Sequence, residues 1–133
     1  ATKEAAGADI RACFIDRKSF EIPAGKRVLI PTGLAFEIPA GYEVQVRPRS
    51  GLSLKTDLLI ANSPGTIDSD YRGEIMIIMA NMGVNHFTVN HGDRIAQIVL
   101  SPVYQAKIVE VDAISNSERG DQGFGSTGIN QKV

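Results

Sequence analysis

Large apolar side chains alternate with small or polar ones along much of this 133-residue chain, as in "LAFEI" at 34–38 and "EVQVR" at 43–47. Successive side chains of a strand point to opposite faces, so this period of two predicts strands with one buried face. Further segments rich in Ile and Val are also predicted strands, namely "RVLI" at 27–30, "EIMIIMA" at 74–80, "HFTV" at 86–89, "RIAQIVL" at 94–100 and "KIVEV" at 107–111. No segment supports a long amphipathic helix, so the pattern indicates an all-β protein.

Pro and Gly punctuate these segments regularly. "IPAG" occurs at 22–25 and at 38–41, which is typical of type I turns, and "NHGD" at 90–93 marks another turn. Short strands separated by turns at such intervals predict a sandwich, a jelly roll or a barrel. One short helical turn is predicted at "SGLSLKT", 50–56, with Ser50 as its N-cap.

Composition excludes several classes of protein. The single cysteine, Cys13, has no partner for an internal disulfide, and one Cys with two His gives no standard zinc pattern. A net charge of -1 provides no field for nucleic acid or an anionic membrane, and no apolar run approaches a membrane span. We therefore expect one soluble, intracellular domain, located in the cytoplasm, without nucleic-acid or membrane partners.

The C-terminal stretch "RGDQGFGSTG" at 119–128 suggests three interpretations. Its glycines match the dinucleotide fingerprint G-x-G-x-x-G, but that motif needs a following helix, and five residues after Gly128 cannot form one. Arg119-Gly120-Asp121 is an adhesion-type tripeptide, yet nothing in the sequence signals secretion. Taken alone, the stretch is best interpreted as a mobile Gly/Ser terminus.

Four other stretches resemble functional loops, namely "AAGAD" at 5–9, "RPRSGLS" at 47–53, "NSPGTIDSDYRGE" at 62–74 and "GDRIAQ" at 92–97. In "PRSG" an arginine, a hydroxyl and a glycine meet at a predicted helix start, which suits a phosphate cradle or an ordinary N-cap. The density of acids with a phenol in "TIDSDYRG" suits a bound water, metal or sugar, or a polar hairpin tip.

Two single residues carry similar alternatives. Gln97 shares the parity of Ile95 and Val99 on a predicted strand, so its half-buried amide either satisfies backbone groups or holds a water. Asp9, which follows Gly7, is either a turn-forming residue or a carboxylate in a metal's outer shell.

The set as a whole is far more specific than its members. "AAGADI", "PRSGLS", "GTIDSDYRGEI", "GDRIAQIVL" and "RGDQGFGSTG", in this order, resemble the five motifs of the trimeric dUTPase family, the deoxyuridine 5'-triphosphate nucleotidohydrolases. The resemblance extends from about residue 5 to residue 129. Family members usually carry another strand before the first motif, so we expect a shorter N-terminal edge here.

The resemblance implies an enzyme that hydrolyses dUTP to dUMP and pyrophosphate with Mg²⁺, by attack of water at the α-phosphorus. This reaction limits dUTP and supplies dUMP for dTMP synthesis. The implied fold is a jelly-roll-like β domain, or distorted β-barrel, with one short helix. The implied assembly is a homotrimer with a C-terminal arm and with active sites at subunit interfaces. We accordingly expect a single β domain over residues 1–118 and a flexible lid over residues 119–133.

The resemblance also implies roles for particular residues. Asp68 matches the carboxylate that deprotonates the attacking water, Gln97 matches the amide that holds this water, and Asp9 matches a carboxylate reaching Mg²⁺ through water. Other matching residues contact the phosphates, uracil, the deoxyribose or the closed lid. This substrate-binding set is Arg49, Ser50, Gly51, Asn62, Gly65, Thr66, Ile67, Tyr71, Met76, Arg119, Phe124, Gly125, Ser126 and Thr127.

Two alternatives remain at the level of sequence. A dCTP deaminase resembles dUTPases in fold, but it needs an added acid/base, and the complete Phe-Gly-Ser-Thr tail favours the hydrolase. The second alternative is a nucleotide-binding or protein-interaction module that kept the fold without catalysis. The presence of Asp68, Gln97 and Tyr71 argues against such a module.

Overall fold

A computed structural model describes residues 2–123 of the chain. These residues form nine strands and one short helix. The elements are β1 (Ala8–Arg11), β2 (Ser19–Ile22), β3 (Arg27–Pro31), β4 (Tyr42–Arg47), α1 (Ser50–Lys55), β5 (Leu58–Ile60), β6 (Gly65–Ile67), β7 (Met76–Asn81), β8 (Phe87–Asn90) and β9 (Arg94–Pro102).

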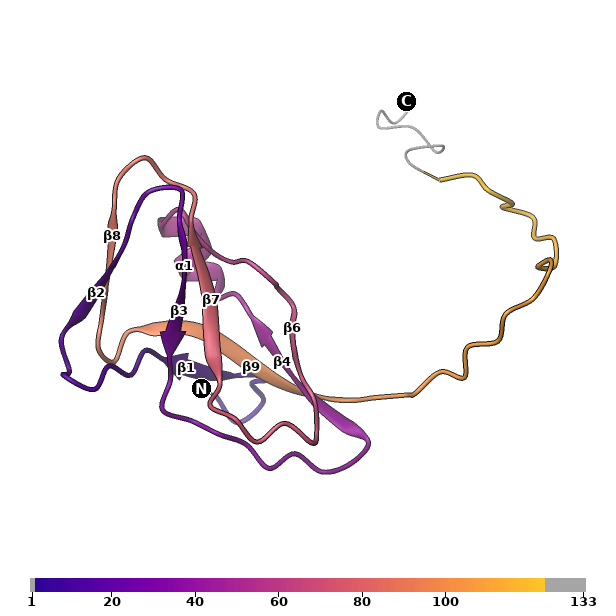
Figure 1. The fold of residues 1–133 in the computed structure, drawn as a ribbon, viewed down its shortest axis with the longest axis horizontal. Helices are drawn as coiled ribbons and strands as arrows, with labels where there is room; N and C mark the ends of the chain where they lie inside the picture. Colours follow the sequence, from indigo (N-terminus) through magenta and orange to yellow (C-terminus); the bar gives the residue numbers. More distant parts are fainter. Residues whose placement is uncertain (1, 124–133) are drawn as a thin grey trace.

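The strands form three antiparallel sheets. The largest has the order β1-β9-β4-β6, a second has the order β3-β7-β5, and a third pairs β2 with β8. Figure 1 shows β3 and β7 crossing in front of β9, with α1 behind β7 in this view. The predicted all-β, jelly-roll-like fold with one short helix is therefore confirmed.

Alternation along the strands builds the core between the sheets. Val44 and Val46 of β4 are buried, while the residues on either side of them are half-buried or exposed. Burying each such side chain contributes about 1.5–3 kcal/mol. The most completely buried side chains come from all three sheets, and they are Ile10, Ile22, Ile30, Ile77, Met79, Val89 and Ile95.

Two predicted strands are not present. Residues 34–38 form no strand, although Phe36 is half-buried and Ile38 is buried as the alternation predicted. One backbone hydrogen bond joins this segment to the residue before β7: the N–H of Ile75 donates to the carbonyl of Leu34. Residues 107–111 form no strand either, because no other segment of residues 2–123 lies beside them to complete a ladder.

The two "IPAG" segments do form turns. The N–H of Lys26 donates to the carbonyl of Pro23, and the N–H of Tyr42 donates to that of Pro39. Gly25 and Gly41 lie at the third turn position with φ of 67° and 86°. A positive φ there belongs to type II turns, so the predicted type I is wrong.

The helix lies where it was predicted, but its N-cap is Arg49 and not the predicted Ser50. The carbonyl of Arg49 accepts hydrogen bonds from Leu52 and Ser53, which makes Arg49 the N-cap and leaves Ser50 inside the first turn. Arg49 makes no side-chain capping bond. Its guanidinium turns away from the helix and toward β1, as described below.

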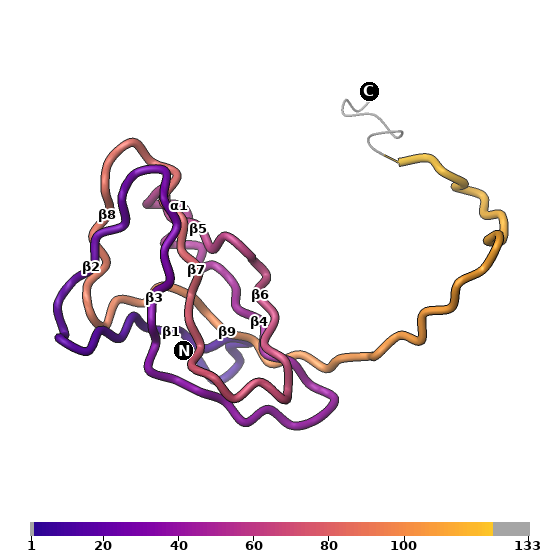
Figure 2. The backbone as a smooth tube through the Cα atoms, viewed as in Figure 1, coloured from indigo at the N-terminus to yellow at the C-terminus, as the bar shows by residue number. Residues whose placement is uncertain are grey.

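After β9 the chain leaves the body, and we call residues 103–123 the C-terminal arm. They contain no helix or strand, and Figures 1 and 2 show them curving away from the sheets in orange and yellow. Large apolar side chains stand exposed along the arm, including Tyr104, Ile108 and Ile114. Within residues 2–123 no helix is both long enough and apolar enough to cross a membrane.

Candidate active site

One pocket, of about 370 Å³, opens where the four-stranded and three-stranded sheets meet. Val46 of β4, Ile60 of β5 and Ile77 of β7 form part of its apolar wall. Seven predicted site residues line it, and we call them the pocket group: Asn62, Gly65, Thr66, Ile67, Asp68, Tyr71 and Met76. The sequence therefore brings a carboxylate, an amide and a phenol to one apolar hollow.

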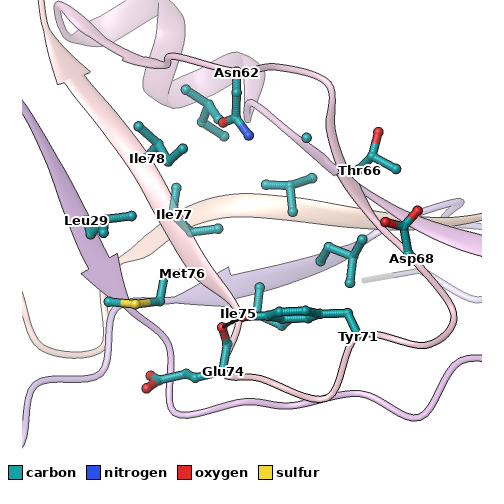
Figure 3. Close-up of a pocket in the computed structure, with 14 residues that line it drawn as sticks. Leu29, Asn62, Thr66, Asp68, Tyr71, Glu74, Ile75, Met76, Ile77 and Ile78 are labelled. Carbon is teal, nitrogen blue, oxygen red and sulfur yellow. Dashed lines mark hydrogen bonds between the residues drawn. The ribbon is translucent and has the colours of Figure 1, made fainter.

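Figure 3 shows Asn62 and Tyr71 on opposite sides of this pocket, with Asp68 at its edge beside Thr66. The carboxylate of Asp68 is exposed and forms no hydrogen bond with another of residues 2–123. It is therefore available to accept a hydrogen bond from water. Asp68 follows directly after β6, so the strand determines its position.

Strand β6 is an edge strand of its sheet. It pairs with β4 on one side, through Val44 with Ile67 and Val46 with Gly65, and no strand of the described chain pairs with its other side. An unpaired strand edge presents N–H and C=O groups in sequence. The pocket thus has a row of backbone donors and acceptors on one side.

Five other predicted residues lie together elsewhere, and we call them the arginine group: Asp9, Arg49, Ser50, Gly51 and Gln97. Arg49 donates from Nε to Oδ1 of Asp9 at 2.7 Å, and from Nη1 to the carbonyl of Arg94 at 3.1 Å. Arg94 reaches Oδ2 of the same aspartate at 3.4 Å. Two guanidinium groups therefore neutralise one carboxylate.

These contacts change the acidity of Asp9. The hydrogen bond from Arg49 holds the pKa of Asp9 below its ordinary value, and the charges of Arg49 and Arg94 lower it further. Slight burial acts in the opposite direction without reversing the shift. Asp9 is thus ionised at neutral pH.

Gln97 of β9 belongs to the same group, because it lies directly across from Asp9 of β1. Its Nε2 donates to the carbonyl of Pro48 at 2.9 Å, just before the helix. Its Oε1 accepts no hydrogen bond from residues 2–123. Of the two predicted roles, the backbone contact is therefore present, while the amide oxygen is free for water.

The two groups do not meet within one chain. Gln97 pairs with Arg47 of β4, whereas Ile67, which precedes Asp68, pairs with Val44 on the other side of β4. Gln97 and Ile67 are therefore three residues apart along the direction of β4 and two strand spacings apart across the sheet. Together these offsets separate the two residues by roughly 14 Å. One water molecule could not contact both Asp68 and Gln97 of the same chain.

Arg119 and residues 124–127 complete the predicted set. Arg119 lies on the C-terminal arm, where its Nε donates to the carbonyl of Gln122 at 2.8 Å. It does not line the pocket. Phe124, Gly125, Ser126 and Thr127 lie outside the described residues.

Not every pocket residue belongs to the set predicted from the sequence. Leu29 and Ile78 line the pocket as members of strands, and Glu74 lies at its rim (Figure 3). Glu74 closes the acidic motif "DSDYRGE", so its position beside Tyr71 was the signal that could have identified it.

The residues around Asp9 determine which kind of metal ion could bind there. Within residues 2–123 no cluster of three or more His, Cys, Asp or Glu could hold one. Mg²⁺ commonly uses one or two carboxylates together with substrate phosphates and water. A single ionised aspartate therefore fits an Mg²⁺ carried by a polyphosphate, and does not fit a metal held by protein ligands alone.

The sequence is similar to those of known proteins. The family model for dUTPase matches residues 1–128. A deoxyuridine 5'-triphosphate nucleotidohydrolase of Rhizobium etli (strain CIAT 652) is 53% identical over 125 residues, which cover 94% of this chain and 80% of that protein.

Solved structures are similar as well. A mutant dUTPase of Staphylococcus bacteriophage 80alpha with dUpNHpp has a TM-score of 0.86 and 28% identity, over 97% of this chain and 89% of that one. A mutant dUTPase from phage phi11 of S. aureus, described with a structural Mg(II) ion, has a TM-score of 0.75 and 25% identity, over 86% and 88% of the two chains.

The fold places this chain in the class of mostly β, jelly-roll-like proteins represented by those solved structures. The family model spans nearly all of the sequence, and the bacterial relative is identical at about half of the aligned positions. The chain belongs to the dUTPase family.

Proposed function

We propose that this chain hydrolyses dUTP to dUMP and pyrophosphate, by attack of water at the α-phosphorus. The reaction would limit dUTP and supply dUMP for dTMP synthesis. Family membership and a phage relative that holds dUpNHpp, an analogue of dUTP, support the proposal. The observation that carries it is the convergence of Asn62, Thr66, Asp68 and Tyr71 on one pocket.

Uracil binds along the edge strand in this proposal. The backbone groups that β6 (Gly65–Ile67) presents at its free edge and the amide of Asn62 read its donors and acceptors. Cytosine reverses that pattern, so buried groups would lose their partners, and such sites reject the wrong base strongly. Met76 lies near the same pocket, and the ring of Tyr71 packs against deoxyribose and leaves no room for a 2'-hydroxyl.

Asp68 acts as the general base. Its exposed carboxylate accepts the proton of the attacking water, and the free Oε1 of Gln97 accepts that water's second hydrogen bond. Neither the carboxylate of Asp68 nor Oε1 of Gln97 forms a hydrogen bond with another of residues 2–123. Both groups therefore suit the binding of a transient water.

The arginine group receives the phosphates. The Nη2 of Arg49, the hydroxyl of Ser50 and the N–H groups of Ser50 and Gly51 meet the negative charge that develops on the leaving pyrophosphate. Asp9 orients Arg49 for this contact through its bond to Nε. Asp9 would also hold Mg²⁺ through water. Bound with the triphosphate, Mg²⁺ would neutralise phosphate oxygens.

A shared site follows from the separation of the two groups. If Asp68 and Gln97 hold one water, they come from different chains, because about 14 Å already separates Gln97 from Ile67, the residue before Asp68, in a single chain. The resemblance to trimeric dUTPases makes the assembly a homotrimer with three sites at its interfaces. The exposed apolar side chains of the C-terminal arm support contact with a neighbouring subunit.

Residues 119–133 serve as the lid over a β domain of residues 1–118, in which the sheets end at Pro102 and the first part of the C-terminal arm follows. Arg119 with Gly125, Ser126 and Thr127 closes on the β and γ phosphates, while Phe124 stacks over uracil. A closing lid excludes water and completes a site.

The enzyme works in the cytoplasm in this proposal. Its single cysteine is a free thiol, as is usual in reducing compartments. Fractionation of cells expressing the tagged chain tests this location.

The reaction itself is tested with purified protein, Mg²⁺ and either dUTP or dCTP. We expect pyrophosphate from dUTP and no ammonia from dCTP. Release of ammonia from dCTP would instead identify a deaminase, and no turnover of either nucleotide would identify a binding module.

A further inference from the structure

The phenol ring of Tyr71 packs against Gly73 and is hydrogen-bonded to Glu74, and we call these two residues the seat of Tyr71. Tyr71 donates from its hydroxyl to the backbone carbonyl of Glu74 at 3.1 Å. A Cβ built on Gly73 would lie 2.6 Å from Cζ of the ring and closer still to its hydroxyl oxygen. The ring therefore occupies the space that a side chain at position 73 would need.

Glu74 is itself anchored to the turn that follows β3. Its Oε1 accepts hydrogen bonds from the N–H of Gly33 at 2.8 Å and of Thr32 at 3.1 Å. One carboxylate oxygen thus holds two backbone groups. Figure 3 shows this carboxylate pointing away from the pocket, while the Tyr71 ring points along it.

The next residue strengthens the same anchor. Ile75 donates from its N–H to the carbonyl of Leu34 at 2.8 Å, and its own carbonyl accepts a bond from Oγ1 of Thr32 at 2.6 Å. Four hydrogen bonds therefore hold residues 74 and 75 to residues 32–34. The carbonyl that receives the Tyr71 hydroxyl has little freedom to move.

The geometry points to Gly73 and Glu74 as positioning residues that determine sugar specificity through Tyr71. This inference rests on the proposed function, in which the Tyr71 ring excludes a ribose 2'-hydroxyl. A ring that merely touches the sugar could swing aside for the extra oxygen. A ring held against Gly73 and bonded to an anchored carbonyl could not, and ribonucleotides are then refused.

Gly73→Ala tests the seat with one added methyl group. Gly73 does not have a positive φ, so alanine adopts its backbone conformation without strain, and the methyl displaces the end of the ring. We expect kcat/KM for UTP to rise on the order of tenfold, chiefly through a lower KM, while kcat for dUTP changes little. A damaged fold would not produce this gain of activity.

Glu74→Leu removes both anchoring bonds, and we expect it to raise UTP turnover in the same direction. Glu74→Gln keeps an acceptor oxygen and should preserve the wild-type preference. Glu37→Leu is the matched control, because Glu37 is an exposed carboxylate without a hydrogen-bond partner among residues 2–123.

The activity of the wild-type protein distinguishes failure of the proposed function from failure of this inference. If it does not hydrolyse dUTP, the proposed function is wrong. If it prefers dUTP to UTP, but both Gly73→Ala and Glu74→Leu raise kcat/KM for UTP by less than threefold, the seat does not determine specificity and only this inference is wrong. A rise of more than threefold in either variant, absent in Glu37→Leu, supports it.

Discussion

Arg49 and Asp9, 40 residues apart in sequence, meet in an ion pair with 2.7 Å between Nε and Oδ1. Arg94 approaches the other carboxylate oxygen. The pair joins the residue before α1 to β1 and orients the guanidinium proposed to bind phosphate. It also makes stability depend on pH.

Asp9→Asn should reduce the sensitivity of the fold to acid. Because the pKa of Asp9 is lowered in the folded state, the pair stabilises the fold above the unfolded pKa, and this contribution is lost as pH falls through the folded pKa. Thermal unfolding of wild type and variant at a series of acidic pH values measures this. The Tm difference should shrink between the ordinary carboxyl pKa and the lower folded value. A constant difference would show that the pair does not titrate there.

Asp68→Asn should lower kcat for dUTP by about 10²–10⁴-fold, the usual contribution of a general base. The amide keeps the shape of the side chain but cannot take a proton. Binding of dUpNHpp, measured by calorimetry, should stay within a few-fold of wild type. Equal losses in kcat and in binding would assign Asp68 to substrate binding instead.

Strand β4, an inner strand of its sheet, was predictable because burial alternates along it. Val44 and Val46 show this in β4. The short strands β5 and β6 were not predicted, since three residues carry too little periodicity to distinguish them from loops. Residues 107–111 show the converse: a β-prone sequence forms a strand only where a partner strand lies beside it.

The residues of the candidate site were predictable as a set. Their separation into a pocket group and an arginine group within one chain was not. The family resemblance implied roles for Asp68 and Gln97, whereas their separation depends on the register of β4 with β6 and with β9. Register is set by the buried faces of the strands and by the turns that join them, and β4 is joined to neither β6 nor β9 by a direct turn, so this register could not be predicted from one motif. The seat of Tyr71 likewise depends on a turn some 40 residues away from Glu74.

Removal of residues 119–133 should lower kcat/KM for dUTP on the order of a hundredfold, because the contacts that position the reacting groups are lost. The sheets end at Pro102, so the truncated chain should keep its thermal stability. The assay is pyrophosphate release at several dUTP concentrations. Unchanged turnover would show that the lid has no role in catalysis.

Ile108→Asp should weaken subunit association. The Ile108 side chain is 93% exposed in the single chain, and burying it on a neighbour would contribute about 1.5–3 kcal/mol. Sedimentation velocity over a dilution series should show the variant dissociating at a higher concentration than wild type. Glu110→Gln on the same arm is the control. Identical dissociation of all three proteins would mean that the arm does not hold the assembly.

Mixing two inactive variants tests most directly whether each site is shared between chains. Asp68→Asn damages the pocket group and Arg49→Ala damages the arginine group. In trimers refolded from equal amounts of both, a site takes one group from each of two subunits. Half of the pocket groups and half of the arginine groups are intact, so about a quarter of the sites should regain both.

Asp68→Asn mixed with Tyr71→Ala is the control, because both changes fall in the pocket group and every site keeps one lesion. We predict dUTP hydrolysis near a quarter of wild type in the first mixture, and no more than the mean of the separate variants in the second. A first mixture no more active than its separate components would contradict a site built between chains.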